Sequence, residues 1–325
     1  ADPSYRADQQ QLARVDATWH SVGAVPQTTD WLNYLTPWNP DDHIAVGLPI
    51  RVPVPGSRVE YYTPAPGRWR HSTSSAPNLG VPMNAFHTYR PGETLTEDWF
   101  RGVLRPAAGR VFETGELLTV AARRDNAMGF DFRDGYWADS EPTHWSPDRL
   151  AQGRLELFRN GESLGASGAW AAGYSVPAEP ADYELLLVNA PNQGPNWQRS
   201  TQVETRFRFP SQQPTGQVAL PIMFPAYQVP LEPDNTVLAR LTQVRLSVTG
   251  HAGYVPERIG GATLAYSFDD GQTWTSAPVR RKADEWTAIV DHRAGSGQRV
   301  TLRLELTGPD GVSVTQTVRD AYTVR

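Results

Sequence analysis

Hydrophobic and polar residues alternate in short runs over most of the chain. Beyond Ile44 these runs are rich in β-branched and aromatic residues and are separated by Gly, Pro, Asn and Asp. They cover residues 50–54, 59–62, 117–121, 155–159, 183–188, 203–209, 244–248, 263–268, 286–290, 300–306 and 312–318. Such runs, broken by turn residues at this spacing, are typical of antiparallel β-sandwiches. The pattern therefore predicts an all-β protein.

One segment near the N-terminus carries a different pattern. Leu12, Val15 and Trp19 recur at three- and four-residue spacing among Gln, Arg and Asp, and no Gly or Pro interrupts residues 5–19. This spacing places apolar side chains on one face of a helix. We therefore expect a short helix at 5–19, followed by a Trp- and Tyr-containing segment that wraps against a sheet.

Turn signals and one polar break organise the predicted strands. Asn160-Gly161 lies between two runs, and this dipeptide is preferred in type I′ hairpin turns because both central residues need positive φ. Residues 210–216 are polar, contain Pro and lack a strand pattern, which predicts an interdomain linker. The expected domains are an N-terminal helix and wrapping segment at 1–43, a jelly-roll or immunoglobulin-like β-sandwich at 44–212, and an immunoglobulin- or fibronectin-like β-sandwich at 213–325.

Composition and charge exclude several classes of partner. The 325 residues carry a formal net charge of -5 at pH 7, which leaves no overall positive field to hold a nucleic-acid backbone. No apolar run approaches the ~18 residues of a membrane helix. Lys282 is the single lysine among 30 basic residues, and Cys is absent. With the abundant Trp, Tyr, Gly and Pro, this bias predicts a secreted, extracellular bacterial protein that neither binds nucleic acid nor inserts into a membrane.

A long polar loop carries the densest group of acidic residues, which are Asp125, Asp131, Asp134, Asp139 and Glu141. Oxygen-rich loops can hold a hard cation such as Ca²⁺, with Asp125, Asp131 and Asp134 as the candidate ligands. The loop lacks the D-x-[DN]-x-[DN]-G pattern, and three Arg residues lie among the acids. A solvated, ion-paired loop is therefore the simpler interpretation, a Ca²⁺ site is the alternative, and no other cofactor is expected.

Aromatic residues share that loop and suggest a binding face. Tyr136, Trp137 and Trp145 lie in polar sequence close to Asp134. Exposed aromatic faces stack on sugar rings and anchor protein interfaces. We take these four residues as the candidate binding residues. The alternative is that these rings, together with Trp170 and Trp197, close the ends of the sandwich.

Two further motifs have mainly structural interpretations. Residues 161–165 match the nucleophile elbow G-x-S-x-G, which would make Ser163 a nucleophile with Asp182 and His251 or His292 as partners. The hairpin at Asn160-Gly161 explains the same glycine without catalysis. Residues 267–274 match the Asp-box pattern S-x-D-x-G-x-T-W, which predicts a structural turn that tucks Trp274 into the sandwich.

Short segments spread over residues 51–322 carry a resemblance to a known family. The segments are 58–62, Tyr89-Arg90-Pro91-Gly92-Glu93-Thr94, Asp98-Trp99, 155–165, 197–209, 264–274 and 300–322. Together they resemble the long C-terminal region of large secreted subtilisin-like (S8 family) serine peptidases of Streptomyces and related actinobacteria. The catalytic motifs of that family, D-[ST]-G, H-G-T and G-T-S-M-A, do not occur in this sequence, so no catalytic residue can be assigned from it.

The resemblance implies a non-catalytic accessory region. Its partner would be the protease domain of a parent polypeptide, or an extracellular protein or polysaccharide that the region positions near that domain. Three alternatives remain open on the sequence. They are a free-standing extracellular carbohydrate-binding protein of lectin type, a serine hydrolase that uses Ser163, and a purely structural domain that stabilises the peptidase.

Overall fold

The protein is built from β-strands arranged in five sheets. The computed structural model describes residues 8–23, 27–36, 46–64, 68–75, 84, 86–111, 114–146, 152–190, 197–283 and 285–325. Within these ranges the one helical element is a 3₁₀ turn, η1 (Gln9–Gln11). None of the described residues forms a helix long and apolar enough to cross a membrane. The predicted all-β class with multiple, mainly antiparallel sheets is confirmed.

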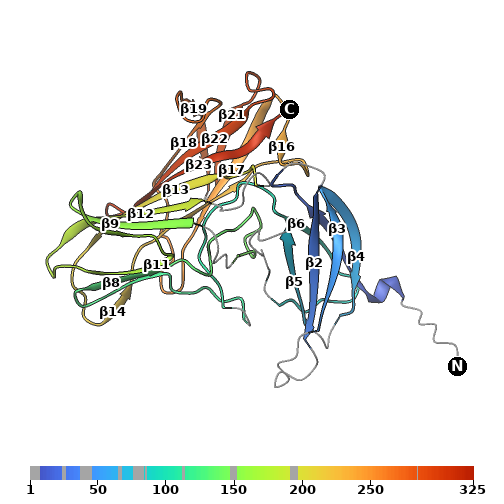
Figure 1. Cartoon of the computed structure of the whole chain (residues 1–325), viewed down its shortest axis with the longest axis horizontal. Coiled ribbons are helices and arrows are strands. Elements are labelled where there is room, and N and C mark those ends of the chain that lie inside the picture. Colours follow the sequence, from blue (N-terminus) through green and yellow to red (C-terminus); the bar gives the residue numbers. More distant parts are fainter. Residues whose placement is uncertain are drawn as a thin grey trace.

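The N-terminal region consists of two three-stranded sheets (Figure 1). One sheet has the order β4 (Gly56–Tyr62), β1 (Ala13–Trp19), β6 (Thr94–Trp99), with β1 antiparallel to β4 and parallel to β6. The other has the order β3 (Val46–Val54), β2 (Gln27–Thr36), β5 (Arg68–Ser75). Trp31 of β2 packs edge-on against Trp19 and Trp99 of the first sheet, at centroid distances of 5.1 and 4.9 Å. These rings join the two sheets.

The predicted N-terminal helix is wrong, because residues 13–19 form strand β1. Ala13, Val15, Ala17 and Trp19 are all buried and alternate with more exposed residues. The small apolar residues Ala13 and Ala17 complete the alternation of buried and exposed residues that is typical of a strand. The larger apolar side chains considered alone show the spacing of a helix. Pairing with strands on both sides then favours the extended conformation.

The largest sheet has nine strands and spans more than half of the sequence. Its order is β10-β9-β12-β13-β23-β22-β18-β19, and β16 pairs with β23 outside this path. The strands are β9 (Gln152–Arg159), β10 (Glu162–Ser167), β12 (Ala181–Ala190), β13 (Gln202–Ser211), β16 (Thr236–Val237), β18 (Gly261–Ser267), β19 (Thr275–Ala277), β22 (Arg299–Thr307) and β23 (Ser313–Val324).

Two four-stranded sheets complete the fold. One has the order β11 (Ala171–Ser175), β8 (Ala127–Asp131), β7 (Ala121–Arg124), β14 (Gln217–Ala219). The other has the order β15 (Phe224–Gln228), β17 (Leu241–Thr249), β21 (Glu285–Asp291), β20 (Val279–Lys282). Inward-facing residues of these sheets and of the nine-stranded sheet belong to one continuous hydrophobic core. A sandwich of this kind keeps polar side chains on its outer faces.

The predicted interdomain linker begins inside a strand. Pro210 and Ser211 belong to β13 and pair with Asp182 and Ala181 of β12. Strand β13 also pairs with β23 over seven residue positions, from Gln202↔Arg319 to Arg208↔Ser313. A division at residue 212 would therefore cut between strands of one hydrogen-bonded sheet.

The predicted hairpin turn is confirmed. Asn160 and Gly161 have φ values of 50° and 86°, and Arg159 pairs with Glu162 across the turn. Positive φ at both central residues is the signature of the type I′ turn, whose twist matches that of the flanking strands.

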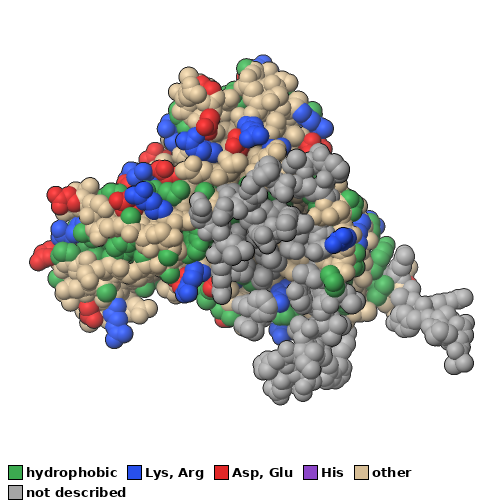
Figure 2. Space-filling view, viewed as in Figure 1, with side chains coloured by type: hydrophobic (Ala, Val, Ile, Leu, Met, Phe, Trp, Pro, Cys, Tyr) green, Lys and Arg blue, Asp and Glu red, His purple; other side chains and the backbone are tan. Residues whose placement is uncertain are grey.

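On the face shown in Figure 2, charged side chains of both signs are interspersed over the strands.

Candidate functional site

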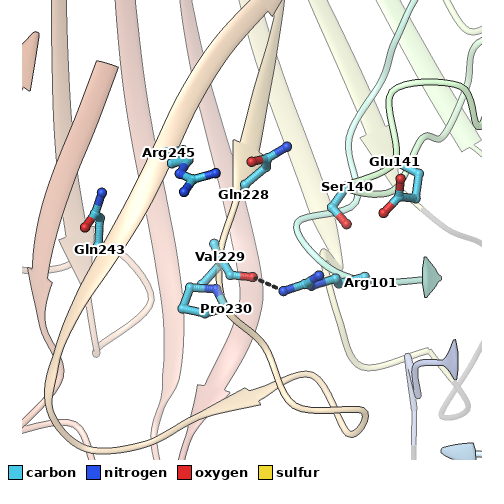
Figure 3. Close-up of a pocket in the computed structure, with 8 residues that line it drawn as sticks. All are labelled: Arg101, Ser140, Glu141, Gln228, Val229, Pro230, Gln243 and Arg245. Atoms are coloured by element: carbon cyan, nitrogen blue, oxygen red, sulfur yellow. Dashed lines mark hydrogen bonds between the residues drawn. The ribbon is translucent and has the colours of Figure 1, made fainter. Parts of the chain in front are cut away.

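A polar cleft lies between loops of the region 100–141 and the sheet that contains β15 and β17. Its volume is about 420 Å³. Its lining residues are Arg101, Ser140, Glu141, Gln228, Val229, Pro230, Gln243 and Arg245 (Figure 3). The first three residues belong to loops, and the other five lie on or directly after the two strands. The cleft is thus assembled from segments far apart in the sequence.

The strand wall presents three polar side chains. Gln228 of β15 lies opposite Arg245 of β17 in the antiparallel register, and Gln243 lies two residues before Arg245 on the same face. The alternation of β17 buries Val244 and Leu246 while it exposes these polar neighbours. Arg245 forms an ion pair with Glu285 at 3.1 Å, and both side chains are more than half exposed, which makes this a weak surface pair.

On the loop wall, Arg101 is held in one orientation. Its Nη1 donates to Asp98 Oδ2 at 2.9 Å, and its Nη2 donates to the carbonyl of Val229 at 3.3 Å. Asp98 also contacts His20 Nε2 at 2.7 Å. Burial acts to raise the pKa of Asp98, but His20 and Arg101 outweigh it and lower that pKa below its ordinary value. The Asp98 carboxylate is therefore ionised at neutral pH and orients the guanidinium.

Asp139 braces the loop that carries Ser140 and Glu141. Its carboxylate accepts hydrogen bonds from the backbone amides of Phe100 at 3.0 Å and Glu141 at 2.9 Å, and it contacts His144 Nδ1 at 2.9 Å. The His144 ring stacks on Trp99 at a centroid distance of 4.0 Å. Burial acts to lower the pKa of His144, but the adjacent Asp139 carboxylate outweighs it and raises that pKa. This buried pair fixes the backbone beneath the cleft.

Arg105 connects the two walls. It is 5% exposed, and its Nε donates to the carbonyl of Pro225 in β15 at 2.7 Å. Its Nη1 donates to the carbonyls of Ala138 and Asp139 at 3.3 and 2.5 Å. A buried guanidinium with several carbonyl partners fixes those segments relative to each other. The cleft therefore has a preformed shape.

Polar atoms in the cleft lack partners among the residues that the structure describes. Ser140 Oγ and Arg101 Nε are buried and form no hydrogen bond there. Within the same ranges the Glu141 carboxylate forms no hydrogen bond or ion pair, and burial raises its pKa. Buried polar groups in proteins are almost always paired, so a group of this kind in a cleft wall marks a place for a ligand. The cleft can bind a polar ligand through donors and acceptors.

A second polar cluster lies inside the N-terminal region. The Glu60 carboxylate accepts hydrogen bonds from Trp31 Nε1 at 3.1 Å and from the Tyr62 hydroxyl. The buried His71 ring contacts the hydroxyls of Tyr62 and Tyr89 at 3.3 and 3.1 Å. Burial lowers the pKa of His71 to about 3, so this ring is neutral.

Glu97 extends this cluster. Its carboxylate accepts hydrogen bonds from Asn84 Nδ2 at 2.7 Å and Trp99 Nε1 at 3.3 Å, and it lies 3.9 Å from His71 Nδ1. Burial raises the pKa of Glu97 to about 7. The cluster is enclosed by aromatic rings and joins the two N-terminal sheets, so we assign it a structural role.

The aromatic residues predicted to form a binding face are buried. Tyr136, Trp137 and Trp145 are 0%, 3% and 2% exposed. The Tyr136 ring packs against Trp137 and against Trp170. No ring face of these three residues is available for stacking on a sugar, which agrees with the alternative that they close the sandwich. Asp134 is partly exposed beside Gly109 and does not line the cleft.

The candidate calcium ligands are not brought together. Asp131 is paired with Arg133, whose Nε lies 2.9 Å from Oδ1. Asp125 occupies the turn between β7 and β8 with a φ of 52°. Over the described ranges, no group of three or more His, Asp or Glu side chains is arranged to hold a metal ion.

Ser163 and the Asp-box have the surroundings of structural elements. The Ser163 hydroxyl donates to Glu156 Oε1 at 2.8 Å on the neighbouring strand β9. The rings of His251 and His292 are engaged elsewhere, with Leu220 and with Tyr322. In the Asp-box, hydrogen bonds from Ser267 and Thr273 lower the pKa of Asp269 to about 2 and close the turn.

Trp274 differs from the expectation that it enters the sandwich. Its ring is partly exposed and lies beneath the Arg303 guanidinium, 4.2 Å from the centroid.

Sequence reasoning singled out a loop that contributes two residues to the cleft, and it named none of the other six. Glu141 was one of the five acids that drew attention to this loop, and Ser140 precedes it. No local pattern connects them with Arg101, Gln228, Gln243 and Arg245. The available signal was the alternation in 241–249, which places Gln243 and Arg245 on the outer face of a strand.

Comparisons with known proteins leave the family open. No family model matches the chain, and no curated protein matches it. Among solved structures, fibronectin(III)-like modules of Clostridium thermocellum CbhA match at 13% identity and a TM-score of 0.20, over 68% of this chain and 95% of that one. Escherichia coli alpha-2-macroglobulin activated by porcine elastase matches at 11% identity and a TM-score of 0.19, over 97% of this chain and 28% of that one.

Proposed function

We propose that this chain is a non-catalytic accessory region that binds a polypeptide in the polar cleft. The observation that carries the proposal is the Glu141 carboxylate, which forms no hydrogen bond or ion pair with the described residues, in a cleft whose walls Arg105 fixes. A preformed cleft loses little conformational entropy when it is filled, which favours binding.

The chemistry of the lining favours a polypeptide over a sugar. Gln228 and Gln243 each present an amide that both donates and accepts, as a peptide group does. The eight lining residues include no aromatic ring, and the rings predicted to stack on sugars are in the core. Hydrogen bonding without stacking therefore suits a peptide backbone.

The resemblance to secreted subtilisin-like peptidases suggests a role for this polypeptide binding. An accessory region of such an enzyme would hold a polypeptide substrate next to the protease domain, outside the cell. An intact Asp/His/Ser protease domain in the same open reading frame would support this association. A locus that encodes no peptidase there would argue for a free-standing binding protein.

Binding to insoluble material gives a direct test. The purified chain is mixed with denatured collagen, chitin or cellulose, and the protein left in the supernatant is measured. We expect depletion by denatured collagen, reduced when Gln228 and Gln243 are both changed to Ala. Gln217 and Gln272 are exposed glutamines outside the cleft, so their double Ala variant is the matched control.

Two results would contradict the proposal. Depletion by chitin or cellulose but not by denatured collagen would identify a carbohydrate-binding protein instead. Equal depletion for the cleft variant and its control would place polypeptide binding elsewhere on the surface.

A further inference from the structure

Among the charged groups that line the cleft, Glu141 is the one without an ion pair in the described part of the chain, and Arg101 and His144 attract its carboxylate only from a greater distance. Arg101 is paired with Asp98 at 2.9 Å, and Arg245 is paired with Glu285 at 3.1 Å. Across the described ranges, Glu141 has no corresponding cation within ion-pair distance. A carboxylate that is partly withdrawn from water and unpaired gains the most from a cationic ligand.

The residue next to Glu141 leaves its hydroxyl behind the surface of the cleft. Ser140 is 8% exposed, and its Oγ is buried and has no partner among the described residues. In Figure 3 the side chains of Ser140 and Glu141 lie side by side on the loop wall. The acceptors that a ligand can reach on this wall are therefore the two oxygens of Glu141. Two carboxylate oxygens suit a group that carries several N–H donors, and an ammonium has three and a guanidinium five.

The opposite wall is suited to the chain that would carry such a cation. Gln228 and Gln243 can accept from and donate to peptide groups across the cleft. The formal net charge of -5 at pH 7 also favours the approach of a basic segment over an acidic one. Local and overall charge therefore point to the same class of ligand.

We propose that the cleft binds a lysine or arginine side chain of a polypeptide, whose N–H groups donate to the two oxygens of the Glu141 carboxylate. This inference rests on the proposed function and narrows its ligand to basic segments.

Peptide binding by fluorescence anisotropy tests the inference. The full chain is titrated into four labelled peptides with one Gly/Ser/Ala host sequence and Lys, Arg, Gln or Glu at the centre. We expect the Lys or the Arg peptide to bind at least about tenfold more tightly than the Gln peptide, and the Glu peptide to bind most weakly. Comparing the affinities of the Lys and Arg peptides shows whether the site prefers an ammonium or a guanidinium.

Substitutions in the chain locate the effect. Glu141→Gln keeps the shape and removes the charge, so the advantage of the basic peptide over the Gln peptide should disappear. Ser140→Ala removes a buried hydroxyl that a ligand cannot reach, and it should leave the advantage of the basic peptides unchanged. Glu305→Gln changes an exposed carboxylate of β22 outside the cleft and should leave all four affinities unchanged.

The outcomes separate this inference from the proposed function. Equal affinity for all four peptides, weakened by the Gln228 and Gln243 double variant, would overturn the cation preference and leave polypeptide binding intact. An advantage of basic peptides that survives Glu141→Gln would also overturn the inference. If no peptide binds and denatured collagen is not bound either, both proposals fall.

Discussion

The interiors of the N-terminal and C-terminal regions are built from different chemistry. Between the two N-terminal sheets lie ionisable groups joined by hydrogen bonds, among them Glu60, His71 and Glu97. In the C-terminal sandwich, strands β17 and β22 bury aliphatic side chains, among them Val244, Leu302 and Leu304, all 0% exposed. Both regions are all-β, so the fold class does not dictate how a core is filled.

The contrast predicts different vulnerabilities. The packing of aliphatic side chains depends on their volume and responds weakly to pH, because these side chains do not titrate. A hydrogen-bonded core depends on the pairing and protonation of each member, because an unpaired buried polar group is costly. Substitutions and pH changes should therefore act on the two regions in different ways.

The largest effect is expected in the aliphatic core. Leu304→Ala removes a fully buried side chain from the centre of β22 and should lower the free energy of unfolding by about 2–5 kcal/mol. Urea denaturation measures the loss, which should be the same at pH 5 and pH 8. A strong pH dependence of this loss would contradict the contrast between the regions.

The hydrogen-bonded core should break when one acceptor is removed. Glu60→Ala removes the acceptor of the buried Trp31 indole N–H and of the Tyr62 hydroxyl, and the unsatisfied Trp31 donor should cost about 1–3 kcal/mol. The loss is measured by urea denaturation against Glu305→Ala, an exposed carboxylate expected to change stability by no more than about 0.5 kcal/mol. Equal losses for both variants would show that the Glu60 network contributes nothing.

Protonation of Glu97 and His71 should make the stability of the N-terminal region depend on pH. The Glu97 pKa of about 7 lies above its ordinary value, so its contribution to stability is complete below about pH 4.5 and is lost as pH rises through 7. The His71 pKa of about 3 lies below its ordinary value of 6.5, so stability is lost as pH falls below 6.5. Between pH 4.5 and 6.5 the two slopes, each at most about 1.4 kcal/mol per pH unit, oppose each other.

Glu97→Gln tests this balance because it removes the pH dependence of stability that arises from Glu97 and keeps the one that arises from His71. We expect the variant to lose stability more steeply than the unmodified protein on acidification from pH 6.5 to 4.5. Hydrogen exchange in β1 and β5, followed at several pH values, reports the change where it arises. An unaltered pH profile would mean that Glu97 does not titrate in this range.

The smallest effect is expected at the β9–β10 turn, outside both interiors. Gly161→Ala forces a Cβ onto a residue with a φ of 86°, although no atom lies within 4 Å of the added group. The cost is conformational alone and should be about 1 kcal/mol. Differential scanning calorimetry should show a modest fall in Tm. A fall as large as that of Leu304→Ala would mean that this hairpin supports the core.

The sequence predicted strands well where alternation was strong and partners were close. The hairpin of β9 and β10 follows from Asn160-Gly161 and the flanking pattern alone. The sequence-based prediction failed at β1, because the parallel partner β6 lies about eighty residues away in the chain and no local pattern indicates such a pairing. The pattern also placed the start of a linker at Pro210, which lies inside β13 because pairing with β12 holds residues 210 and 211 in the strand.

The candidate site shows the same limit at the level of side chains. The pattern of acids and rings at 125–145 drew attention to a loop that contributes to the cleft, but it could not show which side chains face inward. The backbone hydrogen bonds to Asp139 and the Arg105 guanidinium decide that Tyr136 and Trp137 are buried while Ser140 and Glu141 line the cleft. Those contacts join residues that are far apart in the sequence, and the composition of the loop does not predict them.

The pairing of β13 with β23 makes the two halves of the chain mutually dependent. A cut at 212–216 would leave each fragment with an open row of backbone donors and acceptors that the other fragment matches. The pairing of β7 with β14 adds a second junction across the same cut. Fragment complementation, rather than independent folding of two units, is therefore the behaviour that this architecture imposes on a severed chain.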